Sequence, residues 1–181
     1  MKGLVFTELL SMADEHVGED GVDQVLSGCP LSSGGAYTAV GNYPSEELTT
    51  LVGAFSDATQ LDIGQYQRMF GRWMFGTFLD SYPHFFENKA TAFDMLDSVE
   101  EEVHVDVRKL YPDAELPVFK TEHLDAKKMV FIYTSPRGLV DFCHGLIQAC
   151  LDHYGETADI QVEVSRSDKL TTARFDITRL S

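Results

Sequence analysis

The sequence predicts an α+β fold: a mainly helical N-terminal part, then a small antiparallel sheet with one crossing helix. Apolar residues recur at helical spacing through about the first 110 residues. From about residue 118 the period changes, and short alternating segments separated by turn residues follow. Helices first and strands afterwards are typical of this class. The 181 residues are enough for one domain with a sizeable core. We therefore expect a single domain over 1–181, helical over about 1–111 and sheet-containing over about 112–181.

The helical part contains segments with apolar residues three and four positions apart. The predicted helices cover residues 2–17, 21–27, 46–56, 62–80 and 90–110. Gly18 ends the first, and Ser45 is the expected N-cap of the third. The helix over 62–80 is apolar on more than one side, which indicates that it is buried. Pro83 and Pro112 end the last two helices.

The C-terminal part reads as two pairs of strands with a helix between them. Residues 118–123 and 129–134 form a predicted hairpin, and residues 160–164 and 173–177 form a second pair. A helix over 139–154 connects the two pairs. This order predicts a small antiparallel sheet crossed by one helix.

Composition excludes several classes of protein. The formal net charge of -15 repels phosphate backbones and anionic membrane surfaces, so neither nucleic acid nor membrane is an expected partner. No apolar run is long enough to span a membrane, and the N-terminus lacks the pattern of a signal peptide. We expect a cytoplasmic monomer. Cys29, Cys143 and Cys150 show no CxxC spacing and read as free thiols whose role the sequence leaves open.

One histidine has an unusual context. His104 lies on the predicted helix over 90–110, at the border of its apolar face, which comprises Phe93, Leu96, Val99, Val103, Val107 and Leu110. A neutral imidazole that projects from a helix into an apolar cavity is suited to ligate a heme iron. However, His104 also follows the acidic run Glu100–Glu102, and taken alone this context favours a capped or exposed histidine.

A second motif lies at the end of the predicted strand 129–134, where the chain reads Tyr133-Thr134-Ser135-Pro136-Arg137. Alternate residues of a strand share a face, so Tyr133, Ser135 and Arg137 can converge on one target. Two hydroxyls and a guanidinium suit a pair of carboxylates, and heme carries two propionates. Three fixed positions alone form a weak pattern.

Together, the initial Met1-Lys2-Gly3, a histidine late in a long helix and a Y-x-S-x-R motif about thirty residues downstream resemble the heme nitric-oxide/oxygen-binding (H-NOX) domain family. That family includes the heme domain of soluble guanylate cyclase and stand-alone bacterial sensors, and the resemblance covers essentially the whole chain. It implies one heme b, buried between the helical and sheet parts.

The resemblance also implies a role for each motif residue. His104 would be the axial iron ligand, and the Y-x-S-x-R side chains would hold the propionates. Pro117, in the segment before the first strand, matches a proline that presses on the heme and distorts it. An ordinary edge-strand proline is the alternative interpretation of Pro117.

The resemblance further implies a distal gas pocket. Its expected lining residues are Val5, Leu9, Met74, Phe78, Phe142 and Leu146, which otherwise read as core. Family members that bind dioxygen stably have tyrosine at the position of Phe142. Bound dioxygen gains from a hydrogen-bond donor, whereas nitric oxide binds ferrous heme strongly without one. None of the six side chains is a donor, so we expect nitric oxide to be preferred over dioxygen, with carbon monoxide bound more weakly than nitric oxide.

The implied function is that of a sensor, not an enzyme. Release of His104 from the iron on nitric oxide binding would shift the helical part against the sheet part. A separate signalling protein, a histidine kinase or a cyclic-di-GMP enzyme (diguanylate cyclase or phosphodiesterase), would read that shift.

Alternative interpretations remain open. A heme enzyme such as a peroxidase would need a distal acid–base group, for which we see no candidate, and an anionic partner on the proximal histidine. An acidic adaptor without heme would be colourless. A zinc site at Cys143, His144 and Cys150 lacks convincing four-ligand spacing.

Overall fold

The structure is a computed structural model and describes residues 1–180. Its elements, in chain order, are α1 (Gly3–Gly28), α2 (Ser45–Thr59), α3 (Ile63–Ser81), the 3-10 turn η1 (Pro83–Phe85), α4 (Ala92–Ser98), the π-helical turn η2 (Val99–Val103), α5 (His104–Leu110), β1 (Val118–Asp125), β2 (Lys128–Ser135), α6 (Val140–His153), β3 (Ala158–Arg166) and β4 (Thr171–Arg179). Helices precede strands, and one helix crosses between the two strand pairs, so the predicted α+β class is confirmed.

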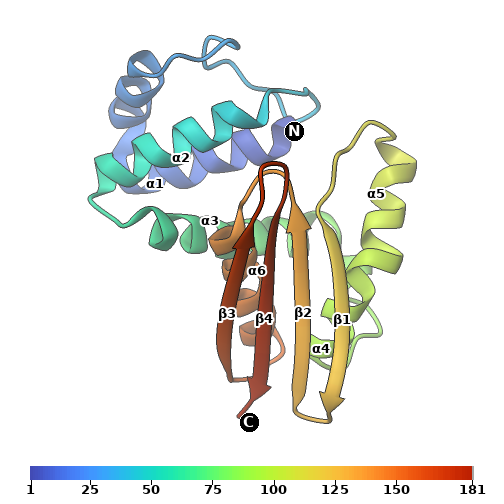
Figure 1. Ribbon diagram of the computed structural model, residues 1–181. Coiled ribbons are helices and arrows are strands. Elements are labelled where there is room, and N and C mark those ends of the chain that lie inside the picture. The colour runs from blue at the N-terminus through green and yellow to red at the C-terminus, as the bar shows by residue number, and fades with distance from the viewer. Residues whose placement is uncertain (181) are drawn as a thin grey trace.

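The elements form a helical end and a sheet with helices on one face (Figure 1). The four strands pair antiparallel in the order β1-β2-β4-β3. Helices α4 and α6 cover one face of this sheet, α1 and α2 lie beyond one end of it, and α5 stands beside β1. The close packing of α3 along α6 joins the helical end to the sheet. None of the helices in the described part of the chain is long and apolar enough to cross a membrane.

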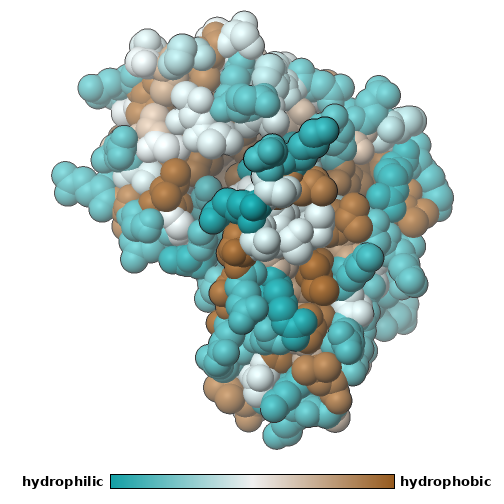
Figure 2. Space-filling model, viewed as in Figure 1, coloured by the Kyte–Doolittle hydropathy of each residue, from teal (hydrophilic) through white to brown (hydrophobic). Residues whose placement is uncertain are grey.

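Strand alternation sorts side chains between the two faces of the sheet. Along β2 and β4, the residues at alternate positions on one face are all buried: Met129, Phe131, Tyr133, Ser135, Thr171, Ala173, Phe175 and Ile177. On the other face of these two strands, Val130 of β2 is buried as well. Figure 2 shows polar side chains over much of the open face. The buried face therefore belongs to the core and carries two residues of the Y-x-S-x-R motif.

Two groups of buried apolar side chains make up the core. The sheet cluster joins α4, α6 and the inner face of the sheet, and includes Phe93, Leu96, Phe131, Tyr133 and Ile147. The helical cluster joins α1, α2 and α3, and includes Phe6, Leu9, Phe55, Phe70 and Met74. Leu146 packs against both clusters, so α6 lies where they meet.

The predicted helix boundaries are confirmed at Gly18 but not at Ser45. Gly18 interrupts α1 with φ 73° and ψ 167°, which separates the two predicted helices as expected. Ser45 is the first residue of α2 and not its N-cap, which is Pro44 with no capping side chain. Glu47 instead uses its buried carboxylate to accept hydrogen bonds from the hydroxyls of Ser32, Ser33 and Tyr37. These bonds fix the loop before α2.

The predicted helix over 90–110 is not uniform. After α4, the backbone forms the π-helical turn η2, and the N–H of His104 donates to the carbonyl of Val99, five residues back. Because a π-helical turn contains one extra residue, every later side chain is rotated about the helix axis relative to its position in a regular α-helix. Val99 and Val103 still pack against the sheet cluster. Leu110 was predicted on the same face, but it is 66% exposed, so that placement was wrong.

Candidate functional site

His104 begins α5, and its ring is enclosed between that helix and β1. The residue is only 7% exposed. Its ring lies against the ring of Phe119, with centroids 5.2 Å apart and planes 28° apart. Its Nδ1 is 3.0 Å from Oε2 of Glu100, the residue one helical turn earlier. His104 is therefore buried and hydrogen-bonded, not exposed.

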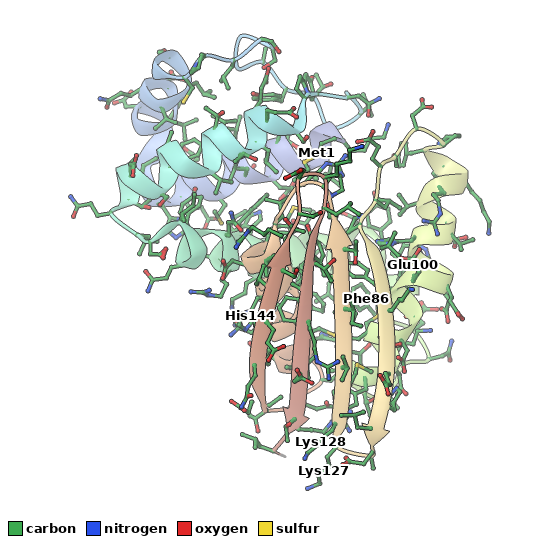
Figure 3. All side chains as sticks on the ribbon, in the orientation of Figure 1. Met1, Phe86, Glu100, Lys127, Lys128 and His144 are labelled. Carbon is green, nitrogen blue, oxygen red and sulfur yellow. The ribbon has the colours of Figure 1, made fainter. Side chains whose placement is uncertain are left out.

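Glu100 belongs to η2, and its carboxylate connects this turn to α5 and β1 (Figure 3). Its Oε2 also accepts the backbone N–H of Phe119 at 3.1 Å, and its Oε1 accepts Nη2 of Arg108 at 3.2 Å. Burial alone would raise the pKa of Glu100, but the hydrogen bonds from Phe119, His104 and Arg108 lower it below its usual value. Glu100 is therefore ionised at neutral pH.

The charge of Glu100 determines the tautomer of His104. Burial lowers the pKa of His104 despite the nearby carboxylate, so the imidazole is neutral at neutral pH. A carboxylate can only accept hydrogen bonds, so Nδ1 carries the proton. The lone pair then lies on Nε2, which is the form of histidine that ligates a metal.

The Y-x-S-x-R residues gather at one end of β2. Tyr133 and Ser135 are 3% and 2% exposed on its buried face. The N–H of Arg137 donates to Oγ of Ser135 at 3.2 Å, and the N–H of Leu139 donates to the Tyr133 hydroxyl at 3.1 Å. Burial raises the pKa of Tyr133, so its hydroxyl keeps its proton. The sequence-predicted trio is thus brought together.

The guanidinium of Arg137 is mostly buried and is paired with a carboxylate. Its Nη1 donates to the main-chain oxygen of Glu115, and its Nη2 lies 2.6 Å from the Glu115 carboxylate. Its Nε is buried and has no hydrogen-bond partner among the described residues. Two hydroxyls and a guanidinium with an unused N–H match the carboxylates of a heme, so the residues present fit this group.

Pro117 occupies the position immediately before β1 and is half-buried. Because alternate residues of an extended chain share a side, Pro117 is placed on the same side as Phe119. Phe119 lies against His104. Pro117 thus precedes by two residues the side chain that contacts His104.

The six expected distal residues come from α1, α3 and α6, and all belong to the helical cluster. Leu9 and Met74 are fully buried, and Val5, Phe78, Phe142 and Leu146 pack against the cluster from half-buried positions. Trp73 and Thr77, which adjoin these residues on α3, each donate to Oε2 of Glu8 at 2.8 Å. The six side chains supply an apolar wall.

Two residues of the site were missed by sequence reasoning. Glu100 was counted with the exposed acidic run, although its spacing of four from His104 is the spacing at which helical side chains meet. Phe119 was read only as part of a strand, although it shares a side with Pro117. Both spacings can be read from the sequence, but such spacings occur at many positions in any chain and do not single out these residues.

The zinc alternative gains no support. Within residues 1–180, no group of three or more His, Cys, Asp or Glu side chains is arranged to hold a metal ion. Cys143 and Cys150 are buried, which raises the pKa of both thiols, that of Cys150 to about 12. Neither is a ready thiolate ligand.

A fold with helices at one end, a four-stranded sheet and a buried neutral histidine between helix and sheet suits a heme-binding domain. The profile of the Haem-NO-binding family matches residues 2–162, and the chain therefore belongs to this family of heme-based gas sensors.

Solved structures agree with this assignment. The Fe(II) unliganded H-NOX protein from K. algicida is 34% identical, with a TM-score of 0.93 over 100% of this chain and 97% of that chain. A point mutant of T. tengcongensis H-NOX is 20% identical, with a TM-score of 0.89 over 100% and 98%. An oxygen-binding H-NOX domain related to soluble guanylate cyclases, also 20% identical, has a TM-score of 0.83 over 100% and 96%. No curated protein matches the chain.

Proposed function

We propose that the chain is a single domain over 1–181 that binds one heme b through His104 and senses nitric oxide. The observation that carries the proposal is a buried, neutral His104 whose Nδ1 is occupied by Glu100, which leaves Nε2 as the metal-binding atom. Membership in a family of heme-based gas sensors supports the choice of heme.

The remaining contacts follow from the chemistry of the side chains. Tyr133, Ser135 and Arg137 would hold the two propionates, because they gather protonated hydroxyls and a guanidinium at one end of β2. Pro117 would press on the edge of the macrocycle. The bound heme would supply an iron that ligates a diatomic gas.

Gas preference would follow from the apolar side chains of the helical cluster. Val5, Leu9, Met74, Phe78, Phe142 and Leu146 carry no hydrogen-bond donor, and the donors of Trp73 and Thr77 are used by Glu8. A wall made of these six side chains offers dioxygen no hydrogen bond and does not hinder nitric oxide. Nitric oxide is therefore the proposed signal, and carbon monoxide a weaker ligand.

The output would pass through α5. This helix begins at His104, and Tyr111 is the residue that follows its end. The Nζ of Lys2 lies over the ring of Tyr111, 4.4 Å from the ring centroid. A movement of His104 would therefore reach the start of α1. A separate signalling protein, a histidine kinase or a cyclic-di-GMP enzyme, would bind one of the two arrangements preferentially.

The test is an absorption spectrum of the reduced, purified protein before and after addition of nitric oxide. We expect a single red-shifted Soret band that moves to shorter wavelength with nitric oxide. His104→Gly should lose the unliganded spectrum and regain it with added imidazole, whereas His84→Gly, at an exposed position, should behave as wild type. A colourless protein after expression with ample heme would contradict the proposal and favour an acidic adaptor.

A peroxidase is the second candidate because Glu100 supplies the anionic partner that such enzymes place on the proximal histidine. The expected distal wall nevertheless offers no acid–base group. We therefore expect the heme-loaded protein to oxidise a phenolic dye with hydrogen peroxide no faster than free heme. Substantially faster turnover would favour the enzyme.

A further inference from the structure

We propose that Glu100 is a positioning residue that sets how strongly His104 donates to the iron. The proposal rests on the proposed function, because it assumes that His104 is the axial ligand. It concerns the strength of the bond between the iron and Nε2 of His104, which depends on the surroundings of the histidine as well as on the histidine itself.

The geometry fixes the Glu100 carboxylate in place. Its Oε2 is shared between Nδ1 of His104 at 3.0 Å and the backbone N–H of Phe119 at 3.1 Å. A backbone donor on β1 cannot rotate away, so this oxygen stays beside the imidazole. The bond from Arg108 falls on the other oxygen, Oε1, and leaves Oε2 to the histidine.

The imidazole is constrained in two directions. The carboxylate holds the Nδ1 edge of the ring, and the Phe119 ring covers one face with centroids 5.2 Å apart. Rotation about the side-chain bonds of His104 would break the first contact and lose the second. Nε2 therefore has one direction available, which is the requirement for a ligand held ready for its metal.

The contact between the neutral imidazole and the Glu100 carboxylate is a charge-assisted hydrogen bond, and burial shields it from water. Exposed i,i+4 pairs contribute little because water screens them. Here the side chain of His104 is 9% exposed and that of Glu100 is 28% exposed. An ionised acceptor strengthens the hydrogen bond, and the negative charge beside Nδ1 makes Nε2 more basic. A more basic ligand holds the iron more tightly and resists release of His104.

The test uses Glu100→Gln, which keeps the shape and an acceptor oxygen but removes the charge. Glu101→Gln is the matched control, because Glu101 is the next residue, is exposed and undergoes the same change in charge. Glu100→Asp keeps the charge on a shorter side chain and covers the case in which glutamine is not tolerated. Circular dichroism confirms that each variant is folded.

The readouts are the stretching frequency of the bond between iron and His104 by resonance Raman spectroscopy, the reduction potential, and the rate of heme transfer to apomyoglobin. In Glu100→Gln we expect a lower frequency, a more positive potential and heme affinity weakened by about 10- to 100-fold. Glu100→Asp should recover part of each change, and Glu101→Gln should match wild type.

Two failures can be told apart. If the wild type has no histidine-ligated heme, or His104→Gly leaves its spectrum unchanged, the proposed function falls and this inference falls with it. If His104 ligation is intact but Glu100→Gln and Glu101→Gln give the same frequency and potential, only the role of Glu100 is overturned.

Discussion

Helices α3 and α6 approach so closely at Gly145 that a methyl group has no room there. A Cβ built on Gly145 would lie 2.1 Å from the main-chain oxygen of Arg68 and 2.8 Å from its carbonyl carbon. Both atoms belong to the backbone of α3, so no side-chain rotation can relieve the overlap. An ordinary contact is about 3.5 Å, so Gly145→Ala must separate the helices locally by more than about 1 Å.

The size of the effect follows from two opposing contributions. Overpacking a close contact costs about 1–3 kcal/mol. Replacement of glycine by alanine within a helix raises the free energy of unfolding by up to about 1 kcal/mol. Gly76 isolates the second contribution, because it lies on α3, is exposed, and has nothing within 4 Å of a built Cβ. Gly145→Ala should therefore be less stable than Gly76→Ala by about 1–3 kcal/mol.

Thermal and urea unfolding of the two variants, followed by far-ultraviolet circular dichroism at equal heme loading, measure this difference. For a domain of this size each kcal/mol corresponds to about 2–4 °C in Tm. Gly76→Ala should unfold at or slightly above the wild-type temperature, and Gly145→Ala below it. Equal Tm values for the two variants would refute the close approach of α3 and α6 at this point.

Two further predictions concern the loop before α2 and the distal pocket. Burial would raise the pKa of Glu47, but hydrogen bonds from Ser32, Ser33 and Tyr37 lower it from 4.5 to about 2. Between pH about 4.5 and pH about 2, the Glu47 carboxylate binds a proton more readily in the unfolded chain than in the folded protein. The stability that Glu47 contributes is therefore complete above pH about 4.5 and is lost as the pH falls toward 2. Urea titrations across this window should therefore give a shallower pH dependence for Glu47→Gln, and an unchanged slope would contradict the assignment. Phe142→Tyr adds a donor to an apolar wall, so the reduced variant should keep dioxygen-dependent absorption bands in air where wild type does not; bands that persist in wild type would show that a donor reaches the gas from elsewhere.

Much of the fold could be predicted because its signals are local. The period of the apolar residues indicated the helices and strands, and Gly18 separated two helices through a backbone conformation that glycine adopts easily. The strand order was not predictable. Placing β4 between β2 and β3 depends on pairing between segments far apart in the chain, which no local pattern encodes.

The candidate site was predicted only in part, for a similar reason. Alternation along a strand is enough to bring Tyr133 and Ser135 to one face. It cannot show that the Glu115 carboxylate pairs with Arg137, because that contact depends on how the segment before β1 folds back. Nor can the acidic run show that Glu100, and not its neighbours, contacts His104. A backbone donor from β1 fixes that contact.

The π-helical turn η2 makes the position of His104 sensitive to chain length as well as to residue type. Removal of one residue from Val99–Val103 would let the helix continue with regular α-helical bonds and little change in helix content. Every later side chain would then turn by about 100° about the helix axis and shift by about 1.5 Å. The imidazole would leave Phe119, and Leu110 would turn away from its present exposed position. A one-residue gap here in an alignment with a relative would therefore mark a chain whose histidine points elsewhere, even if the histidine itself is retained.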